Sequence, residues 1–115
     1  MDTHIYKIYR LAEFSAWLTR LDPDNKAMTL ARIEKMARGT FGDSAPVGRG
    51  VSEARIHEGA GLRIYYLVQG ATIILLMHGG FKSSQVRDIK KAHEILDRLI
   101  AREKDIREMA ITSKD

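Results

Sequence analysis

The chain has 115 residues, 44% of them hydrophobic and 30% charged, and its formal net charge is +4. This length fits one domain with one hydrophobic core. The absence of cysteine excludes disulfide bonds and thiolate metal sites, and no apolar run approaches the roughly 18 residues of a membrane span. Because its start shows no signal-peptide core, we expect a cytoplasmic protein without a membrane partner. The basic balance favours a nucleic acid or an acidic partner.

The first half of the chain predicts one strand and two helices. Residues 5–10 alternate in hydrophobicity, which is typical of a strand. Residues 11–21 predict a short helix with an apolar stripe formed by Phe14, Trp17, Leu18 and Leu21. Asp22 followed by Pro23 predicts the cap and first residue of a second helix, which ends at Arg38 before Gly39. The short connection predicts an antiparallel helical hairpin.

The second helix carries an apolar face and a basic row. The apolar face consists of Leu30, Ile33, Met36 and Ala37. The basic row consists of Arg32, Lys35 and Arg38, which recur every three residues. This row is either an ordinary solvated face or the flank of an RNA footprint. Residues 40–50, rich in glycine, predict a loop that leads into a sheet.

Three strands follow, separated by tight turns. Residues 52–57 and 62–69 alternate strictly, with the turn Glu58–Gly61 between them. Gln69–Gly70 predicts a second turn, and residues 72–77 are apolar on both faces, as in a central strand. As antiparallel neighbours, the three strands are expected to bring together Arg55, Arg63 and Lys82.

A final helix is predicted from about residue 84 to residue 107, capped by Ser83 or Ser84, with Asp88 near its positive end. Its expected buried stripe is Val86, Ile89, Ala92, His93, Leu96 and Leu99. Residues 109–115 are expected to fray or be disordered, which leaves residues 1–108 as the domain. The order is β-α-α-β-β-β-α, an α+β fold with its helices against one side of a small, mostly antiparallel sheet.

Several kinds of site lack their motifs. No two of the four histidines have the i, i+4 spacing of helical metal ligands, and neither HExxH nor an EF-hand loop occurs. No GxSxG elbow supports a serine triad. Gly59 and Gly61 lie between two strands, whereas a dinucleotide fingerprint leads into a helix. We therefore expect no metal and no cofactor.

The second half carries a composite motif. It reads G-V-S-E-x-R-I-x-x-G-x-G-x-R-I-Y-Y, then a short turn, an I-I-L-L-type strand and G-G-x-K-S-S-Q. This motif resembles the RelE/ParE superfamily of type II toxins and, within it, the phage-derived addiction module killer proteins related to HigB. The resemblance spans about residues 14–99 and is specific in the second half. It implies a RelE-like fold, in which a curved sheet carries a helical hairpin on one face.

The resemblance implies a metal-independent, ribosome-dependent messenger RNA endoribonuclease that inhibits translation. Arg55 matches a basic residue that helps to activate the 2′-OH, Arg63 the phosphate-stabilising arginine, and Lys82 a basic residue that stabilises charge or donates a proton. Fixed cations suit this reaction because they favour the more highly charged transition state. Further candidates for catalysis or RNA binding are His57, Tyr65 and Arg87.

The residues also permit structural roles. Glu53 stands where RelE has a second lysine, although glutamate is usual in the killer-protein branch. Arg55 is able to pair with Glu53 along one strand, and Arg63 is able to pair with it across the strand pair. By alternation we expect Tyr66 to lie in the core and Arg63 to point away from it, so that truncating Arg63 costs little stability. Trp17, His78 and His93 are expected to be structural.

The implied partners are a cognate helix-turn-helix antitoxin, the ribosome and messenger RNA, with operator DNA bound through the toxin–antitoxin complex. Two alternatives remain open. ParE-like proteins share the fold and poison DNA gyrase without nuclease activity, but they typically lack the basic cluster. An inactive prophage relic would bind only its antitoxin.

Overall fold

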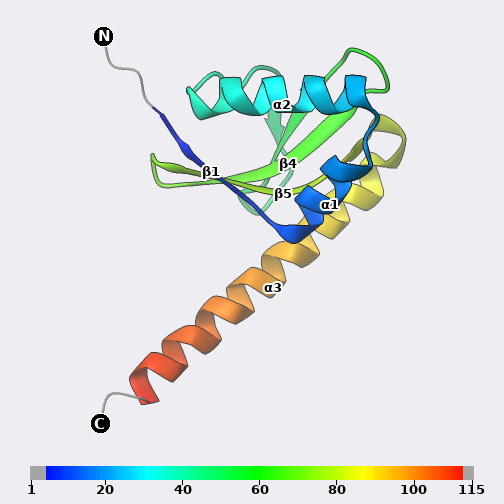
Figure 1. Cartoon of the computed structure of the whole chain (residues 1–115). Coiled ribbons are helices and arrows are strands. Elements are labelled where there is room, and N and C mark those ends of the chain that lie inside the picture. Colours follow the sequence, from blue (N-terminus) through cyan, green and yellow to red (C-terminus); the bar gives the residue numbers. More distant parts are fainter. Residues whose placement is uncertain (1–4, 113–115) are drawn as a thin grey trace.

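The computed structural model describes residues 5–112, and side chains as far as residue 109. It confirms the predicted α+β class and adds one short strand (Figure 1). The elements in chain order are β1 (Lys7–Arg10), α1 (Ala12–Arg20), α2 (Pro23–Ala37), β2 (Ser44–Pro46), β3 (Ser52–Ile56), β4 (Leu62–Gln69), β5 (Ile73–Phe81), a 3₁₀ turn η1 (Lys82–Ser84) and α3 (Gln85–Thr112).

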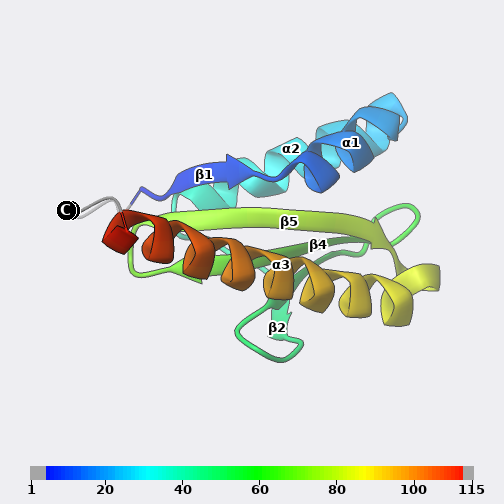
Figure 2. The same cartoon turned by 90° about the horizontal axis from the view of Figure 1, so that it is seen from below.

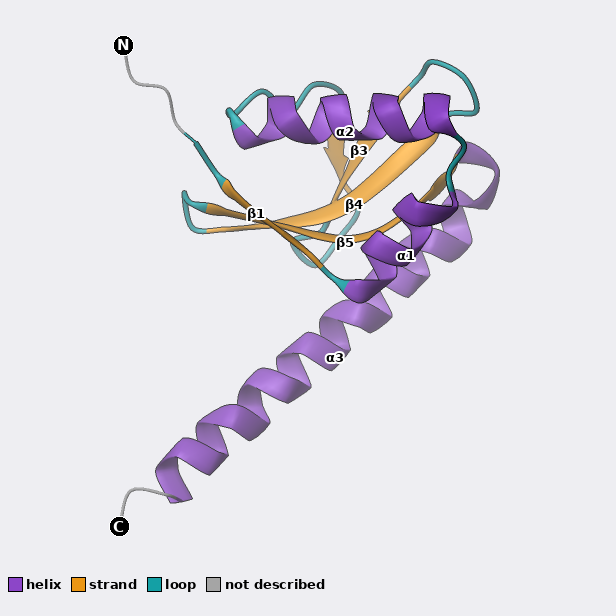
Figure 3. Ribbon diagram, in the orientation of Figure 1, coloured by secondary structure: helices purple, strands orange, loops and turns teal. Residues whose placement is uncertain are grey.

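The sheet has five strands in the order β1-β5-β4-β3-β2 (Figure 3). β1 pairs in parallel with β5, and all other neighbours are antiparallel. The loop predicted over residues 40–50 is wrong at its centre, because Ser44–Pro46 pairs with Ser52–Ala54. Three residues are too few to show an alternating pattern, so the sequence carried no signal for β2.

The helices cover both faces of the sheet, so the prediction that they lie on one side is wrong (Figure 2). Helices α1 and α2 pack with the first core cluster, which includes Phe14, Trp17, Met36, Ile64 and Tyr66. Helix α3 packs with a second cluster on the opposite face, which includes Val51, Tyr65, Met77, Ala92 and Ile95. Successive residues of β4 therefore enter different cores.

The helix ends follow the sequence closely. The side chain of Asp22 accepts a hydrogen bond from the Asn25 N–H, and Pro23 is the first residue of α2, which confirms the predicted start. Two predicted apolar stripes each contain one solvent-facing residue: Leu30 on α2 is 44% exposed, and Val86 on α3 is 86% exposed.

Helix α3 is longer than predicted. It continues to Thr112, beyond the predicted end at Arg107, and residues 113–115 lie outside the described part.

The glycine pair in β5 lets one helix approach each face of this strand. A Cβ at Gly79 would lie 2.2 Å from Cε3 of Trp17, and a Cβ at Gly80 would lie 1.9 Å from Oδ2 of Asp88. Trp17 belongs to α1 and Asp88 to α3. Both glycines are therefore required by close packing rather than by a left-handed backbone.

We expect Gly79→Ala to lower the free energy of unfolding by about 1–3 kcal/mol, because the new methyl group collides with a buried indole ring. Denaturant unfolding of the wild type and the variant measures this difference. Equal midpoints would contradict the packing of Trp17 against β5.

Candidate functional site

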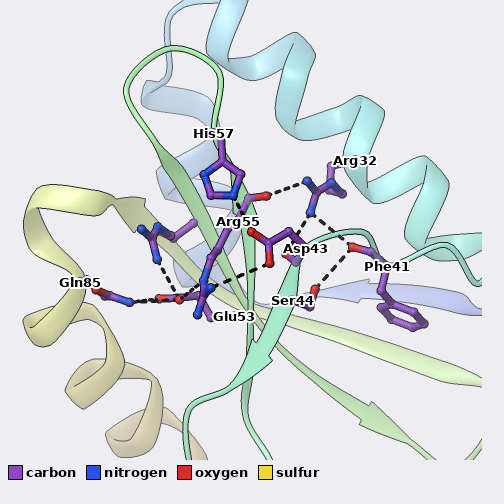
Figure 4. A network of polar contacts seen from close by, with 9 residues as sticks. Arg32, Phe41, Asp43, Ser44, Glu53, Arg55, His57 and Gln85 are labelled. Carbon is purple, nitrogen blue, oxygen red and sulfur yellow. Dashed lines mark hydrogen bonds and ion pairs between the residues drawn. The ribbon is translucent and has the colours of Figure 1, made fainter.

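The carboxylate of Glu53 is the centre of the predicted basic cluster. Arg55 and Arg63 lie directly opposite each other on β3 and β4. Oε1 of Glu53 accepts hydrogen bonds from Nε of Arg55 at 3.1 Å and from Nη1 of Arg63 at 2.9 Å. Oε2 accepts from the Tyr65 hydroxyl at 2.9 Å, and Nε2 of Gln85 reaches both oxygens. One buried carboxylate thus organises four donors, of which Arg55 and Gln85 are labelled in Figure 4.

Two of the predicted site residues are buried. Arg63 points away from the core of Ile64 and Tyr66, as predicted, but it is only 8% exposed, so the expectation that its truncation costs little stability is wrong. Tyr65 is fully buried, which leaves its ring no access to an RNA base. The reason is that α3 covers this face of the sheet, which the sequence had suggested was open. Arg63 forms the ion pair with Glu53 that was the structural alternative.

The hydrogen bonds keep Glu53 ionised. Burial raises the pKa of Glu53, but hydrogen bonds from Tyr65, Arg55 and Gln85 outweigh burial, and the pKa lies below its ordinary value. Burial and the bond to Glu53 raise the pKa of Tyr65 far above its usual range. The charge of the ionised Glu53 therefore offsets that of the Arg63 guanidinium, which weakens the attraction of Arg63 for a phosphate.

A histidine–aspartate pair lies beside this cluster. Nε2 of His57 is 2.5 Å from Oδ2 of Asp43, and Nη1 of Arg55 is 3.8 Å from Oδ1 of the same carboxylate. The hydrogen bond from His57 lowers the pKa of Asp43. The His57 side chain is 71% exposed, and that of Arg55 is 33% exposed. Asp43 thus holds an accessible imidazole and an accessible guanidinium next to each other.

The basic row on α2 is divided between structural and exposed members. Arg32 donates to the backbone carbonyls of Phe41 and Arg55, at 3.3 Å and 2.6 Å, and so fixes the segment before β2 against β3. Arg38 forms an exposed ion pair with Glu34. Lys35 is exposed. Arg32 is thus better explained by structure than by RNA contact, because its donors are engaged within the chain.

Exposed cations gather where β5 ends and α3 begins. A depression of about 570 Å³ is lined by Lys82, Ser83, Ser84, Gln85, Val86, Arg87 and Lys90. Its three cations have no ion pair among the described residues. The backbone N–H of Lys82 donates to the carbonyl of Gly61, which places this lysine beside the turn that leads into β4, the strand of Arg63. Gln85 links the depression to Glu53.

The sequence missed three residues of this surface. Asp43 belongs to residues 40–50, for which the sequence predicts a loop. Its contact with His57 depends on the pairing of β2 with β3. Gln85 is the last residue of the G-G-x-K-S-S-Q motif, so the motif was sufficient to identify it as a candidate site residue. Lys90 follows Arg87 after three residues on α3, so helical spacing was sufficient to find it.

Other kinds of site are not formed by the described residues. Within residues 5–109, no three histidine, aspartate or glutamate side chains are arranged to hold a metal ion. His93 contacts the carbonyl of Val47, and His78 contacts Asp88, which supports structural roles for both. None of the described helices combines the length and the apolar character needed to cross a membrane.

These features define a RelE-like fold with a basic surface at one end of its sheet. The structure aligns with a chain in the crystal structure of the toxin–antitoxin complex RelBE2 from Mycobacterium tuberculosis, with a TM-score of 0.58 and 18% identity. The alignment covers 68% of this chain and 99% of that chain. At this identity the likeness concerns the fold.

Sequence comparison assigns the chain to a family. An uncharacterized protein of Haemophilus influenzae is 42% identical over 80 residues, which are 69% of this chain and 81% of that protein. The chain belongs to the same family as this protein. No protein-family model matches the chain, so the HigB-related, phage-derived branch stays a prediction.

Proposed function

We propose that this protein is the toxin of a type II toxin–antitoxin module and that it cleaves messenger RNA on the ribosome without a metal ion. The observation that carries the proposal is the exposed cluster of Lys82, Arg87 and Lys90 in a RelE-like fold, in a depression that Gln85 connects through Glu53 to Arg55. The structural neighbour RelBE2 is itself a toxin–antitoxin complex, which supports a cognate antitoxin as partner.

In the proposed reaction the 2′-oxygen of one nucleotide attacks the adjacent phosphorus, and the bond to the 5′-oxygen breaks. His57 accepts the 2′-OH proton through Nδ1, while Asp43 holds Nε2 and fixes the orientation of the ring. Lys82 and Arg55 stabilise the negative charge that develops on the phosphorane. Arg87 stabilises the charge that develops on the departing 5′-oxygen, which then takes a proton from water.

Arg63 and Tyr65 have a different role in this proposal from the one the motif implied. Both are buried and donate to Glu53, so they act as positioning residues. Glu53 in turn accepts from Arg55 and Gln85, which lie at the surface. Through this carboxylate the buried pair fixes the positions of the Arg55 and Gln85 side chains.

Induced expression without antitoxin is expected to arrest growth with a rapid loss of protein synthesis and with intact DNA supercoiling. Pulse labelling of new protein and topoisomer analysis of a plasmid measure the two effects. Normal growth with abundant folded protein would indicate an inactive relic. DNA breaks with continuing translation would indicate a gyrase poison, and either result would overturn the proposal.

A further inference from the structure

The second half of α3 extends beyond the sheet. Figure 1 shows this part of the helix running away from the strands, and every side chain from Ile100 to Met109 is exposed. Two apolar side chains of this segment, Ile106 and Met109, are 58% and 68% exposed. A helical segment of this length is only marginally stable in water when nothing packs against it. Covering the segment with a partner would therefore stabilise it.

A hollow opens beside this segment, between the start of α1 and the middle of α3. Its volume is about 570 Å³. Part of its lining is apolar and consists of Leu11, Ala12, Ala16 and Leu99. The rest is charged and consists of Arg102 and the ion pair formed by Glu13 and Arg98. The hollow thus offers apolar surface next to a helix segment whose own apolar side chains are uncovered.

The hollow and the exposed apolar pair lie on one side of the same helix. Leu99, Arg102, Ile106 and Met109 follow one another at steps of three and four residues, so they share a helix face. Because α3 is continuous through Thr112, its second half cannot fold back into the hollow that its own earlier residues line. A second copy of the chain is free to place the same segment there.

We propose that two copies of this chain associate through antiparallel α3 helices, so that Ile106 and Met109 of each copy fill the hollow of the other. A two-fold axis between residues 103 and 104 places residues 98–101 of one copy opposite residues 106–109 of the second. The same axis places Arg102 opposite Asp105 of the second copy. Because the symmetry is two-fold, each of these contacts is made twice.

The charges of the segment favour a second copy as the partner. Residues 102–108 contain three basic and three acidic side chains, so the segment has no net charge that would select an acidic or a basic partner. Arg102 and Asp105 are exposed and have no ion pair among the described residues. Antiparallel pairing brings these opposite charges together. Parallel pairing in register would oppose each charge with its own kind, which is unfavourable.

The proposed dimer is separate from the surface that we propose for RNA cleavage. Arg87 and Arg102 lie about 22 Å apart along the helix axis, at about 1.5 Å per residue. Each copy therefore keeps its depression at Lys82 uncovered, and the inference does not require RNA cleavage. Two short helices bury a small interface, so the association is weak and depends on protein concentration.

Sedimentation equilibrium of the full chain, over a concentration series that reaches the high micromolar range, measures this association. The wild type is expected to pass from monomer to dimer as its concentration rises. Met109→Glu is expected to weaken the dimer at least about tenfold, because it places a charge in an apolar contact. A wild-type chain that stays monomeric at every concentration, or a Met109→Glu variant that dimerises equally well, would overturn the proposal.

Charge reversal tests the register and the direction of the helices. Arg102→Glu opposes two acidic side chains at both ends of the contact and is expected to weaken the dimer at least about tenfold. Adding Asp105→Arg exchanges the two charges and is expected to restore the dimer, which a parallel arrangement would not allow. Lys104→Glu, on the opposite side of α3, is the control and should dimerise as the wild type does. Circular dichroism shows whether each variant is folded, and failure of the double variant to recover would contradict the antiparallel register.

Discussion

Glu53→Ala is expected to lower the free energy of unfolding by about 3–5 kcal/mol, because it leaves the buried Arg63 guanidinium without its counter-ion. The change also removes the acceptor of the buried Tyr65 hydroxyl. Denaturant unfolding measures the loss. The matched control is Glu34→Ala, which breaks an exposed pair with Arg38 and is expected to cost at most about 1 kcal/mol.

The pH dependence of stability gives an independent check on the same carboxylate. The pKa of Glu53 is lowered in the folded chain, so its contribution to stability is present above the unfolded pKa of roughly 4.3 and is lost as the pH falls through the folded pKa. Glu53→Gln removes this contribution without changing the side-chain volume. Unfolding curves of the wild type and Glu53→Gln should therefore converge in acid. Parallel curves down to the lowest pH would contradict an ionised Glu53.

Lys82→Ala is expected to reduce messenger RNA cleavage by about 10²–10³-fold while leaving the fold intact. Its side chain is exposed and has no ion pair among the described residues, so truncation should change stability by at most about 0.5 kcal/mol. The loss of rate follows because one fixed charge near the developing phosphorane is removed. Arg87→Ala is expected to act in the same direction.

The assay compares cleavage, thermal melting and antitoxin binding for each variant. Lys26→Ala, an unrelated lysine on α2, is the control for loss of one positive charge and is expected to keep full activity. Cleavage by Lys82→Ala within a few-fold of the wild type would remove Lys82 from the site. A large fall in melting temperature would indicate that its role is structural.

Local patterns in the sequence predicted much of the fold. Strict alternation in residues 62–69 predicted β4 and assigned Ile64 and Tyr66 to one face and Arg63 and Tyr65 to the other. The capping pair Asp22–Pro23 predicted the start of α2. These features depend on neighbouring residues alone, so they are readable without the tertiary structure.

The predictions that were wrong concern features that depend on contacts between distant segments of the chain. Alternation separates two faces but does not say which face is open, and the position of α3 buried the face that carries Arg63. The pair Arg63–Glu53 was available as an alternative, and burial decided in its favour. The contact between Asp43 and His57 could not be predicted, because it depends on the register between β2 and β3.

The proposed chemistry consequently moves from the middle of the sheet to its end. The motif placed Arg63 at the centre of the reaction, but the accessible positive charge lies at Lys82, Arg87 and Lys90. Arg55 and His57, which both contact Asp43, are accessible as well. The buried carboxylate of Glu53 positions two residues of that surface, Arg55 and Gln85, by accepting hydrogen bonds from them. Mutations in the cluster should therefore affect stability first, and mutations at the end of the sheet should affect cleavage first.

Mapping of new 5′ ends on a ribosome-bound messenger RNA, with purified protein and a chelator specific for transition metals, tests the central claim most directly. The wild-type protein is expected to produce new ends inside the message in the presence of the chelator, and Lys82→Ala is expected to produce almost none. Free messenger RNA without ribosomes should remain largely uncut. An intact ribosome-bound message after prolonged incubation with folded wild-type protein would contradict the account.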